Sequence, residues 1–207
     1  ATTSNGSVAY ANGASYEIGA ANVTLYAVWT PIVIFHSTYG NGYEGWTDNV
    51  LGNPALKHID REHAMMGGFD QDRALGYGKD AWTQYYLIDL APGNYNISFD
   101  LYALDSWDNE WMILEISNDD GVSWNSLWNK RVYLHDNEGL LNERIGNYYG
   151  CWGGTCATDH LFDGDIRPNA TFLHDGGSIK FRFKSTLNEP SWNESFGIDD
   201  IKLERVM

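Results

Sequence analysis

The chain has 207 residues, enough for one large all-β domain or for one domain with a small appendage. Its formal net charge of −15 is repelled by nucleic-acid phosphates and by anionic lipid surfaces, so we expect no nucleic-acid partner. No run approaches the roughly 18 apolar residues of a membrane helix, so we expect no membrane insertion. The excess of carboxylates instead suits a hard cation such as Ca²⁺, which takes oxygen ligands.

Residues 1–31 form the first predicted unit, a short β segment. Residues 1–30 contain no Asp, Lys or Arg, and the run Ala21–Trp29 alternates and is rich in strand-forming residues. The stretches 13–18 and 22–29 resemble the C-terminal half of a Listeria–Bacteroides (internalin B-type) repeat, a small β-grasp-like unit of bacterial surface proteins. The resemblance implies a partial repeat or spacer in a larger chain, which ends at Pro31.

Residues 32–207 form the second predicted unit, a single domain built from recurring strands with turn signals between them. We find no convincing amphipathic helix longer than two turns, and Leu56–Met66 is the best candidate. The pattern predicts an all-β fold, an antiparallel β-sandwich of the jelly-roll type. The predicted strands are Val33–His36, Trp82–Leu90, Tyr95–Leu104, Trp111–Ser117, Ser178–Lys184 and Phe196–Leu203.

A cluster of acidic residues follows the predicted strand Tyr95–Leu104. Asp105, Asp108 and Glu110 lie within six residues of one another, in a loop or strand bend. Like charges packed this closely repel one another, and a bound cation relieves the repulsion. The cluster therefore predicts a calcium site, with a solvated acidic loop as the alternative.

A second acidic pair, Asp199 and Asp200, lies in the last predicted strand. Strand alternation sends the two side chains to opposite faces, so that one of them points at the core. A buried unpaired carboxylate is costly. Either a bound calcium or a contact with a neighbouring loop resolves this cost.

The segments Phe99–Glu110 and Phe196–Leu203 together resemble calcium-containing jelly-roll domains of extracellular proteins, broadly the concanavalin-like, MAM-like and reelin-like sandwiches. The resemblance covers roughly residues 95–203. It implies that Asp105, Asp108 and one of Asp199 or Asp200 are calcium ligands.

The segment Ser117–Trp124 fits the Asp-box, a turn pattern that sialidases carry in several copies and reelin-type jelly rolls carry once. Asp119 is expected to hydrogen-bond the turn backbone, Gly121 to adopt a positive φ, and Trp124 to pack beneath the hairpin. This pattern indicates a structural turn rather than a catalytic site.

Aromatic residues in two glycine-rich segments are candidate ligand contacts, because Tyr and Trp rings stack on sugars and hold peptide side chains. They are Trp46, Tyr148, Tyr149 and Trp152, and core packing is the alternative for each Trp. Cys151 and Cys156 flank a glycine turn and can close a small disulfide ring, which implies an oxidising compartment; two free thiols are the alternative. Asp159, Asp163 and Asp165 form a possible second calcium cluster.

These features favour an extracellular, calcium-dependent binding module of a bacterial surface adhesin, a monomeric unit in a larger chain. Its partner is a carbohydrate or peptide on another cell or surface. A calcium-stiffened spacer is the first alternative. The second is a glycoside hydrolase-like jelly roll, which needs paired carboxylates. No G-x-S-x-G, P-loop or H-E-x-x-H motif occurs, so we expect no enzyme. Available carboxylates are Glu110, Glu115, Glu138 and Glu143.

Overall fold

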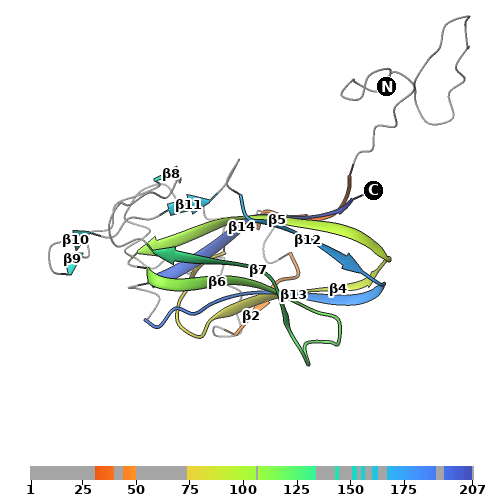
Figure 1. The fold of residues 1–207 in the computed structure, drawn as a ribbon, viewed down its shortest axis with the longest axis horizontal. Helices are drawn as coiled ribbons and strands as arrows, with labels where there is room; N and C mark the ends of the chain where they lie inside the picture. The colour runs from red at the N-terminus through yellow and green to blue at the C-terminus, as the bar shows by residue number, and fades with distance from the viewer. Residues whose placement is uncertain are drawn as a thin grey trace, which may run out of the picture.

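The computed structural model describes residues 31–39, 44–49, 74–105, 107–133, 143–144, 151–152, 155–156, 160–162, 167–189 and 194–206. Within these ranges every regular element is a β-strand, and no helix could span a membrane. The main strands form two antiparallel sheets packed face to face (Figure 1). The predicted all-β sandwich is therefore confirmed. The predicted unit 1–31, apart from Pro31, and the helix candidate 56–66 lie outside the described residues.

The seven-stranded sheet is built around two long neighbouring strands, β5 (Gly93–Asp105) and β14 (Glu194–Val206). β14 pairs on its other side with β1 (Ile32–Ser37) and β3 (Ala74–Tyr77). β5 pairs on its other side with β12 and β11, and β11 pairs with β8. The bounds of these three are Asn169–His174 for β12, His160–Phe162 for β11 and Glu143–Arg144 for β8.

The five-stranded sheet has the order β2-β4-β13-β6-β7, with β13 at its centre. A separate two-stranded hairpin consists of β9 and β10. The bounds are Thr47–Asp48 for β2, Trp82–Leu90 for β4, Asp108–Ser117 for β6, Asn125–Tyr133 for β7, Gly177–Ser185 for β13, Cys151–Trp152 for β9 and Thr155–Cys156 for β10.

Alternation along β13 shows how the sequence selects the two faces of this sheet. Ile179, Phe181 and Phe183 are at most 1% exposed and point into the core. The residues between them are cations that point outward. Each fully buried Phe contributes about 1.5–3 kcal/mol to the free energy of unfolding, so a one-residue slip in register would be prohibitive.

The antiparallel pairing of β5 with β14 decides which loops meet at each end of the sandwich. Glu194, the first residue of β14, lies opposite Asp105, the last residue of β5. The chain turns directly from β5 into β6, so the start of β6 reaches the same end. Acidic residues from two distant parts of the sequence, the start of β6 and the start of β14, are thereby brought together.

Candidate metal centre

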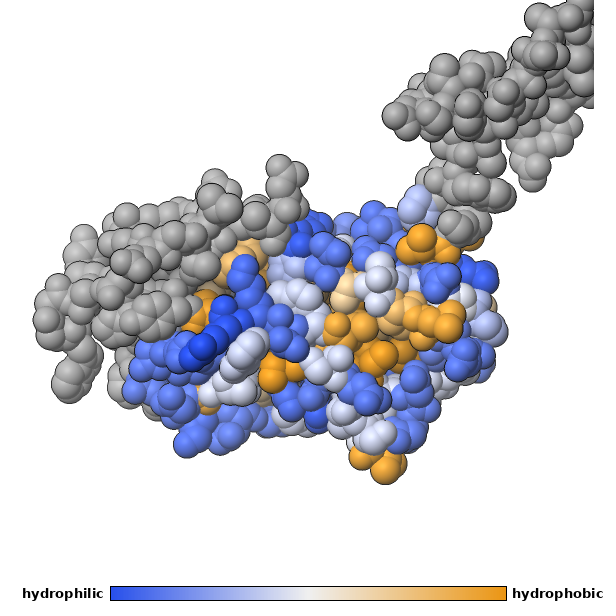
Figure 2. Space-filling view, in the orientation of Figure 1, coloured by the Kyte–Doolittle hydropathy of each residue, from blue (hydrophilic) through white to orange (hydrophobic). Residues whose placement is uncertain are grey.

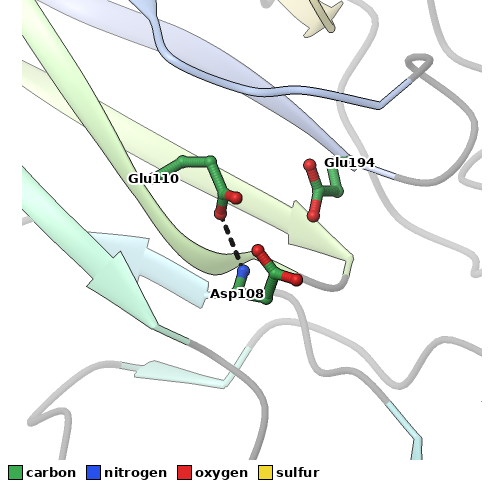
Figure 3. A group of neighbouring side chains, drawn as sticks. All are labelled: Asp108, Glu110 and Glu194. Carbon is green, nitrogen blue, oxygen red and sulfur yellow. Dashed lines mark hydrogen bonds between the residues drawn. The ribbon is translucent and has the colours of Figure 1, made fainter.

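Three carboxylates, those of Asp108, Glu110 and Glu194, converge at this end of the sandwich. One oxygen atom from each lies within 4.8 Å of the others. Figure 3 shows the three side chains turned toward one another, two from the start of β6 and one from the start of β14. Glu110 is 6% exposed and Glu194 is 1% exposed, while Asp108 is exposed. The cluster thus consists of two buried glutamates and one aspartate that is exposed at the protein surface.

A bulge in β6 aims Asp108 and Glu110 at this point. Between Asp108 and Trp111, β6 advances three residues while β7 advances two. Asn109 takes up the extra residue with a φ of 121°. The Asp108 amide then donates a hydrogen bond of 2.7 Å to Glu110 Oε2. Bulges commonly redirect side chains in this way, and here the bulge leaves Glu110 between the two sheets.

Burial and crowding disfavour the charged forms of the two glutamates. Burial, helped by a hydrogen bond with the Asp108 side chain, raises the pKa of Glu110 to about 7. Burial and then the negative charges of Glu110, Asp108 and Glu189 raise the pKa of Glu194 to about 8. In the described part of the chain, no hydrogen-bond partner reaches the buried Glu194 Oε2. The site therefore requires either protons or a cation.

The sequence predicted two of the three members of this cluster. Asp108 and Glu110 lie together as the loop spacing suggested, and Glu194 was missed. Asp105 ends β5 with its backbone opposite Glu194, but its side chain lies outside the described part of the structure. Glu194 is the first residue of the last strand. Its place in the cluster could have been predicted from the sequence only if the pairing of that strand with β5 had been known.

Asp199 and Asp200 do not join the cluster, and the predicted grouping with Asp108 is wrong. Asp199 lies five residues beyond Glu194 on β14, a separation of about 16 Å along a strand. Asp200 Oδ2 lies 2.5 Å from Arg167 Nη2, and Asp200 Oδ1 contacts His36 Nε2. Contacts with Arg167 and His36 therefore satisfy the Asp200 carboxylate. The sequence pattern had left open two ways to do so, a bound calcium and a contact with a neighbouring segment, and the structure shows the second.

Asp199 lies at a bulge of β14, close enough to Tyr39 for its charge to act on that side chain. Its Oδ1 accepts a hydrogen bond of 2.7 Å from the Asp200 amide, at a bulge where Asp200 has a φ of 48°. Burial is the main cause that raises the pKa of Tyr39 well above its usual range, and the charge of Asp199 contributes to that rise.

Trp46 is a core residue, so its prediction as a ligand contact is wrong. It is 1% exposed, and its ring packs against Tyr85 and Phe183. Its Nε1 donates a hydrogen bond of 3.1 Å to Ser37 Oγ. No face of the indole is open to a sugar. Tyr148 and Tyr149 lie outside the described residues, as does the side chain of Trp152 in β9.

The turn between β6 and β7 forms with the predicted hydrogen bonds. Asp119 Oδ1 accepts bonds of 2.9 Å from the Ser123 amide and 2.8 Å from Ser117 Oγ. Gly121 has a φ of 88°, and Trp124 Nε1 donates 3.0 Å to the Gly121 carbonyl. Hydrogen bonds from Ser123 lower the pKa of Asp119 to about 2. These hydrogen bonds make the turn a structural element.

The hairpin of β9 and β10 places Cys151 directly opposite Cys156 in its backbone register. Cross-strand neighbours have a Cα separation of about 4.5–5.5 Å, within the range of disulfides. The disulfide itself remains a prediction. Asp159, Asp163 and Asp165, the possible second calcium cluster, lie outside the described residues.

A shallow groove of about 370 Å³ opens beside β12, on the half of the sandwich where Figure 2 shows apolar surface. Leu173 and Val206 at this groove are 69% and 41% exposed. The residues that line the groove carry no charged side chain and offer no chemistry beyond apolar contact. They are Asn94, Tyr95, Thr171, Phe172, Leu173 and Val206.

No family model matches the chain, and no curated protein matches it. Among solved structures, the K3 cleaved adhesin domain of Lys-gingipain from Porphyromonas gingivalis is 10% identical, with a TM-score of 0.47 over 83% of this chain and 99% of that chain. The CBM22-1 xylan-binding domain from Paenibacillus barcinonensis is 10% identical, with a TM-score of 0.47 over 87% and 98%. The K1 adhesin domain of the same gingipain is 11% identical, with a TM-score of 0.44 over 84% and 98%. Likeness at this level says nothing about the ligand or activity of the present chain.

Proposed function

We propose that this chain is an extracellular β-sandwich module that binds calcium at Asp108, Glu110 and Glu194 and recognises a carbohydrate or peptide. The observation that carries the calcium site is Glu194, a residue that is 1% exposed and has one carboxyl oxygen without a hydrogen-bond partner in the described structure. That carboxyl group lies beside two others. Three carboxylates this close repel one another in the empty site, and a bound cation attracts all three.

Calcium suits the donors of this cluster better than zinc does. All three are carboxylate oxygens, and the cluster includes no His or Cys. Calcium takes six to eight oxygen ligands in irregular geometry, whereas zinc prefers nitrogen and sulfur. The Asn188 amide lies 3.2 Å from Glu110 Oε1. A half-turn of that amide offers its oxygen as a further ligand.

A cation at this position would join the two sheets. Asp108 and Glu110 belong to β6 of the five-stranded sheet, and Glu194 belongs to β14 of the seven-stranded sheet. The bound ion would hold the two sheets together at one end and order the chain that leaves them there. Ordered loops at the end of a rigid sandwich are a common place for ligand recognition.

Thermal unfolding in calcium and in chelator tests the metal centre. A free ion concentration of about 100 times Kd stabilises the folded state by about 2.7 kcal/mol, which raises the midpoint by about 5–10 °C in a domain of this size. Glu194→Gln should remove the calcium response and raise the midpoint in chelator, because the cost of protonating or burying this carboxylate in the empty site is removed. Glu204→Gln, on the same strand and paired with Lys202, is the matched control.

Two results would contradict the metal centre: equal midpoints in calcium and chelator, or a Glu194→Gln variant that responds to calcium as the wild type does. A panel of sugars and peptides added to the calcium-bound protein then separates a binding module from a spacer. A ligand that raises the midpoint supports the binding module. Calcium stabilisation with no ligand response favours the calcium-stiffened spacer.

A glycoside hydrolase is the second candidate function, favoured by the raised pKa values of Glu110 and Glu194. A carboxyl group that stays protonated at neutral pH can act as a general acid. Both side chains are at most 6% exposed, however, which leaves little room for a sugar. Release of reducing ends from a polysaccharide panel, abolished by Glu110→Gln, would establish the hydrolase in place of the binding module.

A further inference from the structure

The outward face of the five-stranded sheet carries a row of cations at its centre. Lys180, Arg182 and Lys184 alternate along β13, so neighbouring members of the row lie about 7 Å apart. Their side chains are 19%, 19% and 34% exposed. Arg131 of β7 extends the positive charge across the sheet, opposite Trp111. Four of the 13 cationic residues of a chain with a net charge of −15 thus share one face.

Aromatic and amide side chains lie directly beside the cationic row. The register of β4 and β13 pairs Tyr86 with Lys180, Gln84 with Arg182, and Trp82 with Lys184. Tyr86 is 45% exposed, and Trp111, at the far end of the row on β6, is 41% exposed. The face therefore combines positive charge, planar apolar rings and hydrogen-bonding groups over about six residues of strand, or about 20 Å.

Contacts within the face hold two of its cations in place. Arg182 lies 3.9 Å from the centre of the Trp124 ring and donates bonds of 2.9 and 2.6 Å to Glu115 Oε2. Lys184 Nζ lies 2.8 Å from Glu115 Oε1. Since one buried carboxylate is shared between two cations, their charge is only partly neutralised. Side chains that are already ordered lose less entropy when a ligand binds.

Lys180 is placed to exchange its partner for a ligand. Its Nζ lies 5.2 Å from the centre of the Tyr86 ring and 2.7 Å from Asp120 Oδ1. The Asp120 side chain is 75% exposed, and an ion pair with so exposed a partner contributes little stability. A carboxylate on a ligand could replace the Asp120 side chain at low cost, while Lys180 Nζ keeps its hydrogen bond of 2.8 Å to the Asp120 backbone carbonyl.

We propose that this face binds a carboxylated polysaccharide, a polymer of uronic acid units. The proposal rests on the binding-module function above and names its ligand class. The cationic row complements carboxylates spaced along a chain, the exposed rings can stack on sugar rings, and Gln84 can bond hydroxyl groups. The net charge of −15 repels every polyanion, and it repels a nucleic-acid duplex most, because the duplex carries one charge per about 1.7 Å of its axis.

The test is calorimetric titration of the protein with an oligogalacturonate, compared with the fully methyl-esterified oligomer as a neutral control. The experiment uses a buffer without free calcium, because the oligomer also binds that ion. We expect the charged oligomer to bind, the ester to bind far more weakly, and added salt to weaken binding of the charged form. A poly-glutamate peptide tests whether charge alone is enough, and we expect it to bind weakly.

Lys184→Gln and Lys202→Gln form a matched pair for this titration. Their side chains are 34% and 33% exposed, and each pairs with a glutamate, at 2.8 and 2.6 Å, on opposite sheets. Lys184→Gln should weaken oligogalacturonate binding by about tenfold, the loss of one charged hydrogen bond, and Lys202→Gln should leave binding unchanged. Unfolding midpoints establish that both variants are folded.

Equal binding of the ester, equal binding of poly-glutamate, or equal effects of the two lysine variants would overturn the proposal. The metal centre fails separately. The unfolding midpoint could be the same with and without calcium while oligogalacturonate still binds and Lys184→Gln weakens that binding. This result would refute the metal centre and support the polysaccharide-binding face.

Discussion

Of the three carboxylates in the candidate metal centre, that of Glu194 is the most unfavourable to keep charged when no cation is bound. It is the most buried of the three carboxylates, its pKa is raised to about 8, and it is the member contributed by the other sheet. Asp108 can turn toward water from its exposed position, and Glu110 accepts hydrogen bonds from the Asp108 amide and from Asn188. Substitution of Glu194 is therefore the most discriminating test of the site.

Asp119 makes the stability of the turn between β6 and β7 depend on pH. Its pKa in the folded protein is about 2, below the ordinary value of 3.8, so the charged form stabilises the fold. This contribution is complete above about pH 4 and is lost as the pH falls through the folded pKa of about 2. We expect Asp119→Asn to be less stable than the wild type at neutral pH, with the difference disappearing near pH 2.

Urea unfolding of the two proteins across this pH range measures the difference. Asp120→Asn, one residue along the same turn, is the control for a general change in net charge. A difference that stays constant down to pH 2 would show that the Asp119 charge has no special role in the turn.

At the residue scale, the sequence predicted contacts between residues that lie close together along the chain. Asp108 and Glu110 are two residues apart, and Asp119, Gly121 and Trp124 belong to one turn, so the pattern contains their relationship. Glu194 comes from more than 80 residues further along, and only the β5–β14 register brings it near. Trp46 was misassigned because a glycine-rich flank looks the same whether the ring points outward or into the core.

At the scale of elements, all six strands predicted in residues 32–207 lie within observed ones because their alternation is strong. Trp82–Leu90 was predicted to the residue, and Tyr95–Leu104 lies within β5. Bulges were not predictable, since they arise from pairing between strands. The bulge at Asp200 interrupts the alternation on which the orientation of Asp199 and Asp200 was argued. The short strands β2, β8 and β11 gave no sequence signal, because two or three residues carry no periodicity.

The hairpin of β9 and β10 makes a prediction about its two cysteines. Because Cys151 and Cys156 face each other across the ladder, we expect them to be joined when the protein is produced under oxidising conditions. Closing a loop of this size stabilises the protein on the order of 2 kcal/mol. Thiol titration of the unfolded, unreduced protein should find no reactive cysteine, and the double serine variant should unfold at lower urea concentration. Two reactive thiols would refute the disulfide.

At the scale of the whole molecule, the first strand of the described sandwich begins directly after Pro31. β1 begins at Ile32, opposite Arg205, and its pairing with β14 runs from there to Ser37. We expect a chain that begins at Pro31 to unfold cooperatively at the same midpoint as the full chain and to keep its calcium response. A lower midpoint or a lost transition would move the domain boundary into the first 30 residues.

Charge is distributed unevenly over this molecule. The net charge is −15, yet the cationic row and Arg131 share one face of one sheet. The three clustered carboxylates lie at one end, between the two sheets. Ion binding and polymer binding would therefore use different side chains, so one can be removed by substitution without the other.

The antiparallel pairing of β1 with β14 also determines how the domain responds to force. Residues 32 and 205 are partners, so tension applied between the start of β1 and the end of β14 pulls on two strand ends that lie side by side. The ladder then opens one residue pair at a time, as a zipper does, which requires little force. The carboxylate cluster lies at the opposite end of β14 and keeps its geometry while β1 peels away. Under tension the molecule would lengthen from one end first, with its ion site the last part to be disturbed.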